Sequence, residues 1–438
     1  MEPEALARAV IGRLRGAGHR AWLVGGAVRD LLLGARPKDF DVSTGARPER
    51  IMDLFPGSGL VGARFGVVLV RDGGAQVEVA TFRSDHAYTD GRRPSEVRFE
   101  SDPREDVLRR DFTVNGLMLD PATGEVLDYV GGRRDLEDSL IRAIGDPGAR
   151  FREDHLRLLR GIRFAARLGF AIEPATLEAI RQNHALILNV SAERARDELV
   201  RILTEGGARR GFELLDSSGM LEDVLPEVAA MKGVEQPPEY HPEGDVWVHT
   251  LVLLEHLARP TPTLAMGALL HDVGKPPTFR VAGRIRFDGH VEEGVRLAEG
   301  ILDRLRFSRH DAEQVLALVA NHMRFKDVGH MKASTLKRFL RLPEFGEHLE
   351  LHRLDVLASN RRMESYDFAC AKLAEYSAEH LSPPRLVTGA DLIAAGYTPG
   401  PLFSKILALV EDAQLEGRVR SRDEALQLVG SAYAALKK

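Results

Sequence analysis

The chain has 438 residues, with 60 lysines and arginines against 65 aspartates and glutamates, and a net charge of −5. This length exceeds what one hydrophobic core usually serves, so we expect several domains. A composition that is 44% hydrophobic and 29% charged excludes a disordered or fibrous chain, and the mildly acidic balance excludes a uniformly basic nucleic-acid coat. A local basic surface that holds a phosphate backbone is still compatible with these numbers.

Cysteine content and apolar runs indicate the compartment. Cys370 is the only cysteine, so no intrachain disulfide forms and a Cys-ligated zinc site is excluded. The first 21 residues lack the continuous apolar core of a secretory signal. No stretch approaches the roughly 18 apolar residues of a membrane span. We therefore expect a cytoplasmic protein without a membrane partner.

The first informative segment, residues 23–30, places Gly25 and Gly26 between a predicted strand and a predicted helix. Glycine lets the backbone approach a phosphate closely, and a helix N-terminus presents free N–H groups to an anion. A glycine pair also forms plain turns, so this segment is compatible with either reading.

A pair of carboxylates, Asp39 and Asp41, follows in a predicted strand. Residues two apart in a strand face the same side, so the two carboxylates are expected to point together. They repel each other, and a divalent cation relieves that repulsion. Hard oxygen ligands favour Mg²⁺, which can activate a hydroxyl nucleophile. Glu78, in a hairpin predicted around residues 72–74, is either a third carboxylate at this metal or the polar side of an exposed strand.

Two polar segments come next. Residues 82–94, which contain Gly91 and end at Pro94, are predicted to form a mobile loop. Residues 109–115 offer guanidinium groups for phosphate or ribose, and Asn115 for a ribose hydroxyl or a backbone turn. A solvated charge cluster is the alternative for this second segment.

After about residue 150 the leucine and alanine spacing becomes helical. One half of the first predicted helix is apolar, with Leu159, Ile162 and Ala166, and the other half carries the charged set Asp154, Arg157, Arg160, Arg163 and Arg167. We expect the apolar half to pack and the charged half to be free to bind. Aspartate beside arginine can accept from the amine of cytosine or adenine and donate to the neighbouring acceptor, at about 1–3 kcal/mol of discrimination per good contact. A salt-bridged helix face is the alternative.

Positive charge continues behind this helix. The arginines concerned are Arg181, Arg194, Arg196, Arg201, Arg209 and Arg210, and the C-terminal segment adds Lys405. These cations either bind RNA phosphates or only solvate helices. Recognition of A-form RNA is expected to rest on shape and backbone.

A second constellation of ligand-type side chains lies on predicted helices farther along the chain. It comprises His249, His271, Asp272 and Asp355, with His290 and His322 as further candidates. Imidazole together with carboxylate favours a transition metal, or Mg²⁺ where carboxylates dominate. Any single histidine is more often a packed or surface residue.

Residues from about 20 to 170 closely resemble the ordered motifs of the bacterial class II tRNA nucleotidyltransferases and poly(A) polymerases, within the DNA polymerase beta-like superfamily. The matching segments are LVGGAVRDLLLG, DFD, RRDFTVNGLMLD, DYVGGRRDLEDSLIRAIGDP and EDHLRLLRGIRFAARLGF. The resemblance implies an α+β fold with a mixed-sheet head, an all-α neck, an HD helical domain and a helical tail. With the boundaries indicated by proline-rich segments and composition, the predicted domains are 1–150, 151–235, 236–376 and 377–438.

The resemblance also implies roles for individual residues. Asp39 and Asp41 would bind Mg²⁺, and Arg110 would join them as a catalytic residue. The predicted nucleotide-binding residues are Gly25, Gly26 and Arg29 at the triphosphate, Arg110, Asp111 and Asn115 near the ribose, Asp154 and Arg157 as the protein template for C and A, Glu153 holding Arg157, and Arg160 and Arg163 lining the nucleotide.

Residues 271–276, HDVGKP, are similar to the signature of HD-domain phosphohydrolases, which are attached to some tRNA nucleotidyltransferases. His249 and Asp355 stand in the complementary places. The set implies a bound metal and hydrolysis of a phosphoester, such as a cyclic phosphate at an RNA end.

The resulting prediction is a Mg²⁺-dependent enzyme that adds CCA to the acceptor end of tRNA from CTP and ATP. Loops similar to residues 82–94 occur in relatives that add the terminal A, which disfavours a CC-only enzyme. An A-adding-only enzyme and a poly(A) polymerase stay open as alternatives, and a phosphohydrolase whose first domain only binds RNA is a rival of another class.

Overall fold

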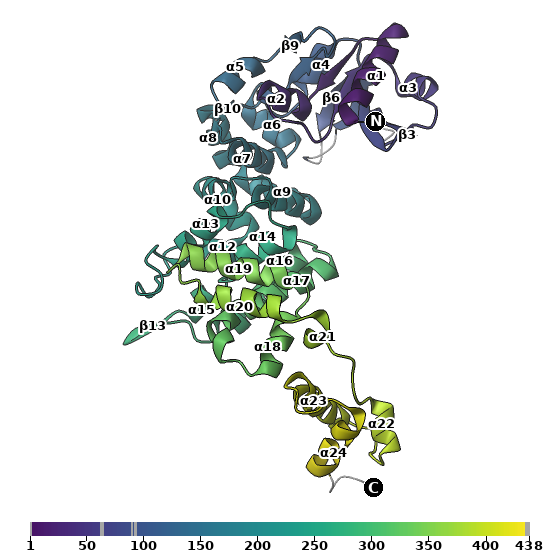
Figure 1. Cartoon of the computed structure of the whole chain (residues 1–438). Helices are drawn as coiled ribbons and strands as arrows, with labels where there is room; N and C mark the ends of the chain where they lie inside the picture. Colours follow the sequence, from purple (N-terminus) through teal and green to yellow (C-terminus); the bar gives the residue numbers. More distant parts are fainter. Residues whose placement is uncertain (1, 62–64, 89–90, 92–93, 434–438) are drawn as a thin grey trace. The chain divides into compact units, whose positions relative to one another are not determined.

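The computed structural model describes residues 2–61, 65–88, 91 and 94–433. It divides into two compact units (Figure 1). Unit 1 comprises Met1–Ala230 with Leu257–Arg259 and Asp303–Phe307, and unit 2 comprises Met231–His256, Pro260–Leu302 and Ser308–Lys438. Among the described residues, no helix has the length and apolar character needed to span a membrane. The four-domain division of the sequence stays a prediction.

Unit 1 begins with a seven-stranded mixed sheet. Its strand order is β3 (Gly59–Leu60), β4 (Val67–Asp72), β5 (Ala75–Thr81), β2 (Asp41–Thr44), β1 (Ala21–Val24), β8 (Leu117–Leu119) and β9 (Val126–Asp128). Every neighbouring pair is antiparallel except β2 and β5, which run parallel. The predicted hairpin at residues 72–74 is confirmed, with φ of +53° at Gly73 and +86° at Gly74. Alternate residues of β5 enter the core, so Glu78 faces away from Val77 and Val79.

Along the chain, four helices precede or separate the strands of this region: α1 (Pro3–Gly16), α2 (Gly26–Leu32), α3 (Pro48–Leu54) and α4 (Pro103–Leu108). Helix α1 packs against β1 and β5 through the buried side chains of Leu6, Val10 and Leu14. Helix α2 follows β1 directly, as the position of the glycine pair predicts.

The mobile loop predicted for residues 82–94 is wrong for the part that the structure describes. Arg83–Tyr88 forms strand β6 and Pro94–Phe99 forms strand β7, and the two pair antiparallel from Arg83↔Phe99 to Tyr88↔Pro94. Proline is tolerated as the first residue of a strand. The prediction stopped at Pro94 and so missed the partner strand. Residues 89, 90, 92 and 93 lie outside the described residues.

The remainder of unit 1 is mainly helical, as predicted. It holds the short helix η2 (Thr113–Asn115), α5 (Gly132–Glu137), α6 (Pro147–Glu153), α7 (Arg157–Leu168), α8 (Pro174–Asn183), η3 (His184–Asn189), α9 (Ala192–Thr204), α10 (Ala208–Ser217), α11 (Met220–Val224) and α12 (Pro226–Ala229), with a short parallel pair β10 (Leu140–Ile141) and β11 (Ala171–Ile172). The apolar face predicted for α7 is buried.

The predicted continuity of the charged helix is wrong at its start. Helix α6 ends at Glu153, and Asp154 is extended, with φ −138° and ψ 104°. Arg157 then begins α7. Asp154 and the four arginines therefore do not share one helix face, because the helix is interrupted between Glu153 and Arg157.

Unit 2 consists mainly of helices. They are α13 (Val246–Glu255), α14 (Pro262–Leu270), α15 (Lys275–Thr278), α16 (His290–Arg304), α17 (Arg309–Asn321), η4 (His322–His330), α18 (Ala333–Leu340), α19 (Phe345–Ala358), α20 (Glu364–Glu375), α21 (Ala378–Leu381), α22 (Gly389–Ala394), α23 (Leu402–Leu415) and α24 (Arg422–Tyr433). A small hairpin, β12 (Arg280–Ala282) with β13 (Arg284–Arg286), interrupts them and was not predicted. Helices α22–α24 enclose a core of their own around Leu392, Ile406 and Val410.

Candidate active site and candidate metal centre

The first candidate site, here called the carboxylate site, consists of Asp39, Asp41 and Glu78. Asp41 opens β2 and lies directly beside Glu78 in the parallel register with β5, so both side chains leave the same face of the sheet. Phe40 is buried on the other side. Asp39 precedes the strand, so the predicted two-residue strand spacing does not describe it.

Electrostatics nevertheless place Asp39 close to Asp41. Although part of Asp41 is open to solvent, burial of its carboxyl and the charges of Glu78 and Asp39 together outweigh the opposing Arg110 and raise its pKa to about 6. Carboxylates that repel in this way are the usual setting for a divalent cation. The donor types therefore suit Mg²⁺, and Glu78 is a candidate third ligand, although these carboxylates are not among the described groups that place three ligand atoms within 4.8 Å of one another.

Gly25 brings the backbone close to this cluster. A Cβ at this position would lie 3.3 Å from Arg110 Nη1 and 3.8 Å from Asp41 Oδ2, and φ is +71°, a conformation that favours glycine. The turn between β1 and α2 thus passes beside one cation and one anion of the site. An added side chain at Gly25 would crowd the Arg110 guanidinium.

Asp106, which the sequence reasoning missed, orients the arginines of the site. Its carboxylate accepts from Arg110 Nη2 at 3.0 Å and from Arg109 Nη2 at 2.5 Å. Burial acts to raise the pKa of Asp106, but the two guanidinium groups outweigh it and hold the pKa at about 2. The sequence signal for Asp106 was its position three and four residues before Arg109 and Arg110, because side chains at these spacings are neighbours on a helix.

Arg29, expected at a triphosphate, is 2% exposed and held from several sides. It donates to Asp30 Oδ1 at 2.8 Å and to Asn115 Oδ1 at 2.7 Å. Asn115 donates to Asp111 Oδ1 at 3.1 Å, and the other Asp111 oxygen accepts from Arg160 at 2.5 and 2.8 Å. Burial would raise the pKa of Asp111, but Arg160 keeps it well below its usual range. These predicted nucleotide-binding residues thus form one connected network.

The charged face of α7 is ion-paired in the structure, and nucleotide binding by its arginines stays a prediction. Each of its arginines already has a carboxylate partner: Arg157 with Glu153 at 2.8 Å, Arg160 with Asp111 at 2.5 Å, Arg163 with Glu198 at 2.6 Å and Arg167 with Asp30 at 3.1 Å. Helix α9 supplies Glu198 and helix α2 supplies Asp30 to these pairs. Three guanidinium groups also surround the Phe164 ring, those of Arg29, Arg160 and Arg163, at 5.2, 5.3 and 4.3 Å from its centre.

The two predicted template residues are held by different partners. Arg157 donates to Glu153 at 2.8 Å, the expected partner, and to the Arg109 carbonyl at 2.8 Å. Asp154 instead pairs with Arg194 of α9, whose Nη2 lies 3.3 Å from both carboxylate oxygens. Only the fold brings Arg194 to Asp154, and the sequence had indicated it merely as a phosphate contact. The roles of these residues toward a base stay predictions.

The remaining predicted RNA-contacting arginines also have partners in the structure. Arg201 and Arg209 lie near Glu198 at 3.7 Å and Glu213 at 3.0 Å, and the others donate to backbone carbonyls or to neighbouring acids: Arg181 to Ser217, Arg196 to Arg306 and Asp197, and Arg210 to Phe170. Lys405 is exposed on α23. A role of these side chains in RNA binding stays a prediction.

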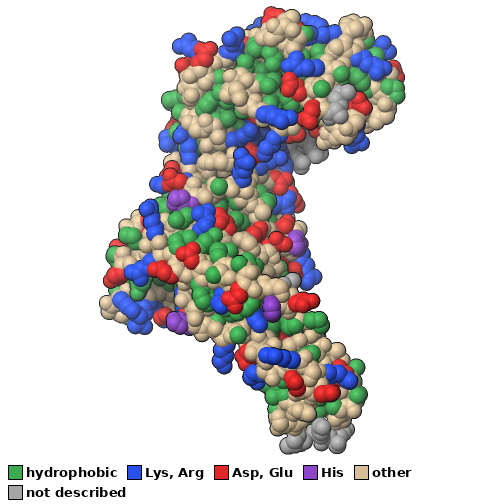
Figure 2. Space-filling model, in the orientation of Figure 1, with side chains coloured by type: hydrophobic (Ala, Val, Ile, Leu, Met, Phe, Trp, Pro, Cys, Tyr) green, Lys and Arg blue, Asp and Glu red, His purple; other side chains and the backbone are tan. Residues whose placement is uncertain are grey.

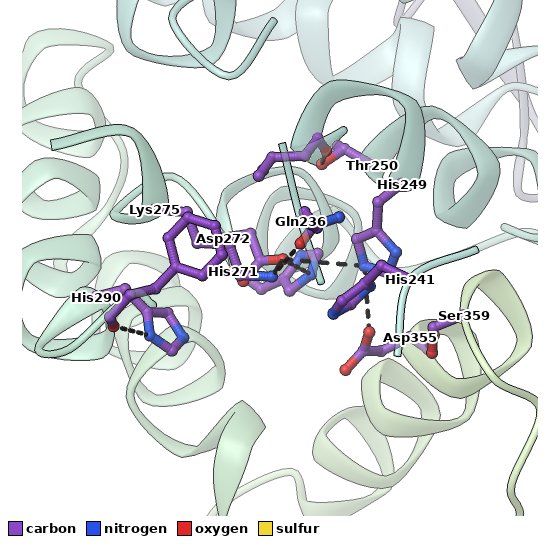
Figure 3. A network of polar contacts seen from close by, with 12 residues as sticks. Gln236, His241, His249, Thr250, His271, Asp272, Lys275, His290, Asp355 and Ser359 are labelled. Atoms are coloured by element: carbon purple, nitrogen blue, oxygen red, sulfur yellow. Dashed lines mark hydrogen bonds and ion pairs between the residues drawn. The ribbon is translucent and has the colours of Figure 1, made fainter. Parts of the chain in front are cut away.

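The second candidate site, here called the histidine centre, comprises His249, His271, Asp272, His290, His322 and Asp355. They come from separate parts of unit 2: from α13, the turn after α14, and the elements α16, η4 and α19. Two groups each place three ligand atoms within 4.8 Å of one another: His249, His271 and Asp355, and Asp272, His290 and His322. Figure 3 shows His249, His271, Asp272 and Asp355 turned toward a common centre.

Backbone carbonyls orient three of these histidines. Nδ1 of His271, His290 and His322 lies 2.8, 2.9 and 2.7 Å from the carbonyls of Ala268, Phe287 and Val319. Nδ1 of His249 instead meets Glu243 Oε1 at 2.6 Å. A ring N–H given to such an outer partner leaves the lone pair on Nε2, which is the usual arrangement of a metal-ligating histidine.

The four Nε2 atoms point inward and are buried. Within the described residues none has a hydrogen bond of acceptable geometry, although Asp355 Oδ1 lies 3.2 Å from His249 Nε2 and Asp272 Oδ2 lies 3.2 Å from His271 Nε2. Burial lowers the pKa of His322 to about 4, which keeps its ring neutral, whereas for His249 the hydrogen bonds to Asp355 and Glu243 outweigh burial and raise the pKa to about 9. Buried ring nitrogens beside carboxylates fit a divalent metal ion, which would replace the proton of His249.

Four polar residues around the histidine centre were not assigned from the sequence. Lys275 Nζ lies 2.6 Å from Asp272 Oδ2 and 2.6 Å from Gln236 Oε1. Glu243 contacts both His241, at 2.9 Å, and His249. The sequence signal for Glu243 was an acidic residue placed between two histidines, His241 and His249.

Three protein-family models match the chain. The Poly A polymerase head domain matches residues 21–142, the probable RNA and SrmB-binding site of polymerase A matches residues 169–232, and the HD domain matches residues 246–358. The first lies in unit 1, as does the second except for its last two residues, and the third includes every residue of the histidine centre.

Curated relatives carry two names. The CCA-adding enzyme of Lactobacillus helveticus is 40% identical over 251 residues, 56% of this chain and 62% of the relative, and that of Bacillus pumilus is 38% identical over 264 residues, 59% and 66% of the two chains. The poly(A) polymerase I of Escherichia coli O157:H7 is 42% identical over 229 residues, 50% and 49% of the two chains. The matches thus span about half to two thirds of these relatives.

Solved structures extend the likeness over the whole chain. The Bacillus stearothermophilus CCA-adding enzyme in complex with CTP aligns with a TM-score of 0.76 and 25% identity over 99% of both chains. The Thermotoga maritima CCA-adding enzyme complexed with tRNA has the same fold, with a TM-score of 0.58 and 19% identity over 99% of this chain and 96% of that one. The chain belongs to the α+β nucleotidyltransferase family that contains the CCA-adding enzymes and bacterial poly(A) polymerases, and it carries an HD domain.

Proposed function

We propose that the protein is a tRNA nucleotidyltransferase that adds CCA to the tRNA 3′ end from CTP and ATP, without a nucleic-acid template, in the cytoplasm. The observation that carries this proposal is the carboxylate site. Asp41 and Glu78 lie side by side on parallel strands, with the Gly25 turn and Arg110 at their edge. The relatives named CCA-adding enzyme support the choice of tRNA, CTP and ATP.

The residues of this site divide the chemistry among them. Asp39, Asp41 and Glu78 would hold Mg²⁺, which when bound supplies charge neutralisation for the triphosphate and activates the 3′ hydroxyl. The glycine turn lets the triphosphate approach the backbone. Arg110, oriented by Asp106, donates to a phosphate or ribose oxygen and stabilises the charge that develops on the leaving pyrophosphate.

Base choice falls to Asp154 and Arg157. Asp154 accepts from the exocyclic amine of cytosine or adenine, and Arg157 donates to the neighbouring ring acceptor. Glu153 and the Arg109 carbonyl hold the Arg157 guanidinium in place, so its direction is set before the nucleotide arrives. Guanine and uracil present a carbonyl and an N–H in these places and would leave both protein groups unpaired.

Two alternatives fall within the same chemistry. One is an enzyme that adds only the terminal A, and the other is a poly(A) polymerase, which the 42% identical relatives of that name support. The test uses tRNAs that end before CCA, after C and after CC, each incubated with single labelled nucleotides. Extension of all three supports CCA addition, whereas addition only to the CC-ending tRNA, or long A tails on unrelated RNA, overturns it.

A second activity is proposed for the histidine centre, the hydrolysis of phosphate esters at RNA ends. The four inward, buried Nε2 atoms beside Asp272 and Asp355 support it, because they fit a transition metal or Mg²⁺. His271→Ala and Asp272→Ala should lose bound metal and hydrolysis of a 2′,3′-cyclic phosphate, while the exposed control His310→Ala should keep both. Unchanged metal content and activity in the first two variants would refute the proposal.

The alternative function, a phosphohydrolase whose first domain only binds RNA, makes a different prediction. It requires Asp41→Asn to keep every activity of the protein, because no chemistry would then take place at the carboxylate site. Loss of nucleotide addition in this variant, with cyclic-phosphate hydrolysis retained, excludes the rival and separates the two proposed activities.

A further inference from the structure

The β12–β13 hairpin is the one exposed two-stranded ribbon described in unit 2. Gly283, with φ +72°, turns the chain between the strands, and five of the six strand residues are exposed. Figure 1 shows β13 reaching away from the helices, and Figure 2, in the same orientation, shows basic side chains at that tip. Neither proposed active site uses the strand residues.

All the charged residues of the two strands are arginines. Arg280 and Arg286 are register partners, and Arg284 lies opposite Ala282. Like charges directly opposite each other destabilise a strand pair. For these three arginines the structure gives no carboxylate partner among the residues it describes, in contrast to the four arginines of α7. Three exposed cations without an internal anion are suited to an external one.

Apolar groups accompany these cations. Val281 is 69% exposed and Phe279, just before β12, is 37% exposed. The Phe279 ring contacts the Phe287 ring with their centres 5.9 Å apart. Arginine together with exposed aromatic surface is the combination that binds single-stranded nucleic acid, because phosphates pair with guanidinium groups and bases stack on rings.

The base of the hairpin packs against the histidine centre. Lys275 Nζ lies 5.4 Å from the centre of the Phe287 ring and 2.6 Å from Asp272 Oδ2. The carbonyl of Phe287 also orients His290. The second strand of the ribbon therefore leads directly into Phe287, which contacts the candidate metal ligand His290. Three strand residues span about 10 Å, which is the length of one or two nucleotides of an extended strand.

We propose that the hairpin is an arm that binds the backbone of a single-stranded RNA end and leads its terminal phosphate to the histidine centre. Arg280, Arg284 and Arg286 pair with phosphates, and Phe279 stacks on a base. The use of the bound end rests on the proposed phosphoesterase activity, whereas the binding itself does not.

The test compares two triple variants of the full chain. The first is Arg280→Gln, Arg284→Gln and Arg286→Gln, and the charge-matched control is Lys326→Gln, Lys332→Gln and Arg385→Gln, three other exposed cations of unit 2. Fluorescence anisotropy measures binding of a labelled single-stranded 12-nucleotide RNA over a series of KCl concentrations, in EDTA. EDTA removes metal, so failure of hydrolysis does not affect this result.

The hairpin variant should bind the RNA about tenfold or more weakly at low salt, and its slope of log affinity against log salt should fall by about 2, as expected for three lost phosphate contacts. The control should stay within about twofold of the natural chain, and both variants should add nucleotides to tRNA at the natural rate. Equal affinity and slope in the two triple variants would overturn the proposal.

A second measurement locates the RNA and does not depend on a variant. RNA with 4-thiouridine near its 3′ end, irradiated on the natural protein, should crosslink to residues 279–287. Crosslinks confined to unit 1 would overturn the arm. Preferential, hairpin-dependent binding of a polyglutamate peptide over RNA would also overturn it, by assigning the surface to an acidic protein.

Discussion

The carboxylate site and the histidine centre are both built from metal-ligand side chains, but the protein prepares them differently. At the carboxylate site, burial of the Asp41 carboxyl and repulsion by Glu78 and Asp39 raise its pKa to about 6, although part of the residue is open to solvent. In the histidine centre, backbone carbonyls and Glu243 fix the rings. The first arrangement suits a cation that arrives with a charged substrate, and the second suits a resident ion.

The largest expected effect tests the role of the open site. Asp41→Asn should lower the rate of nucleotide addition by about a thousandfold, because one carboxylate ligand of the cation is lost. The melting temperature should not fall, since the change removes a repelled charge. The exposed control Asp53→Asn, on α3, should keep the natural rate. A rate above a tenth of the natural one would show that Asp41 is not a ligand.

Metal removal tests the contrast directly. If the histidine centre holds a resident ion, chelation should lower the free energy of unfolding of unit 2 by about 2.7 kcal/mol when the metal is present at a hundred times its dissociation constant. Calorimetry with and without chelator measures this difference. His271→Ala should abolish it and Asp41→Asn should leave it intact. The same shift in all three proteins would assign the ion to another place.

Base selection tests how firmly the nucleotide residues are held. Glu153→Gln should weaken the hold on Arg157 and lower the preference for CTP over UTP about tenfold, at the lower end of the 1–3 kcal/mol of a bidentate contact. Single-nucleotide incorporation with each labelled triphosphate gives the ratio. The control Glu213→Gln, which loosens an exposed pair with Arg209, should not alter it. Unchanged selectivity in Glu153→Gln would mean that Arg157 needs no positioning.

The smallest expected effect concerns pH. The folded-state pKa of Asp41 is raised from 3.8 to about 6, so the protonated folded form is favoured and ionisation costs stability. Relative to Asp41→Asn, the natural protein should lose stability as pH rises from about 4 to 6 and remain level above about 7. Because Asp41 is partly exposed, we expect about 1 kcal/mol or less. Metal-free unfolding of unit 1 at pH 5 and pH 7.5 measures the difference, and a constant gap between the two proteins would contradict it.

Short-range patterns in the sequence predicted much of the fold and the composition of both sites. The alternation around Glu78, the Asp-Gly turn after β4 and the apolar face of α7 are local features, because side chains two to four residues apart share a face. The glycine pair and the histidine signature are also short motifs. From the sequence alone, the first suggested a phosphate-binding turn and the second a bound metal.

Tertiary structure decided which of these groups are paired. Asp154 meets Arg194 across 40 residues, Arg163 meets Glu198 across 35 and Arg167 meets Asp30 across 137, so the charges expected to be unpaired are ion-paired within the chain. Residues 83–88, predicted as part of a loop, form a strand because they pair with β7, which begins at Pro94. No spacing rule encodes such contacts, since they arise when separate elements pack. The same packing leaves the β12–β13 arginines without carboxylate partners in the described part of the chain, so a basic face exists where the fold supplies no acid to cover it.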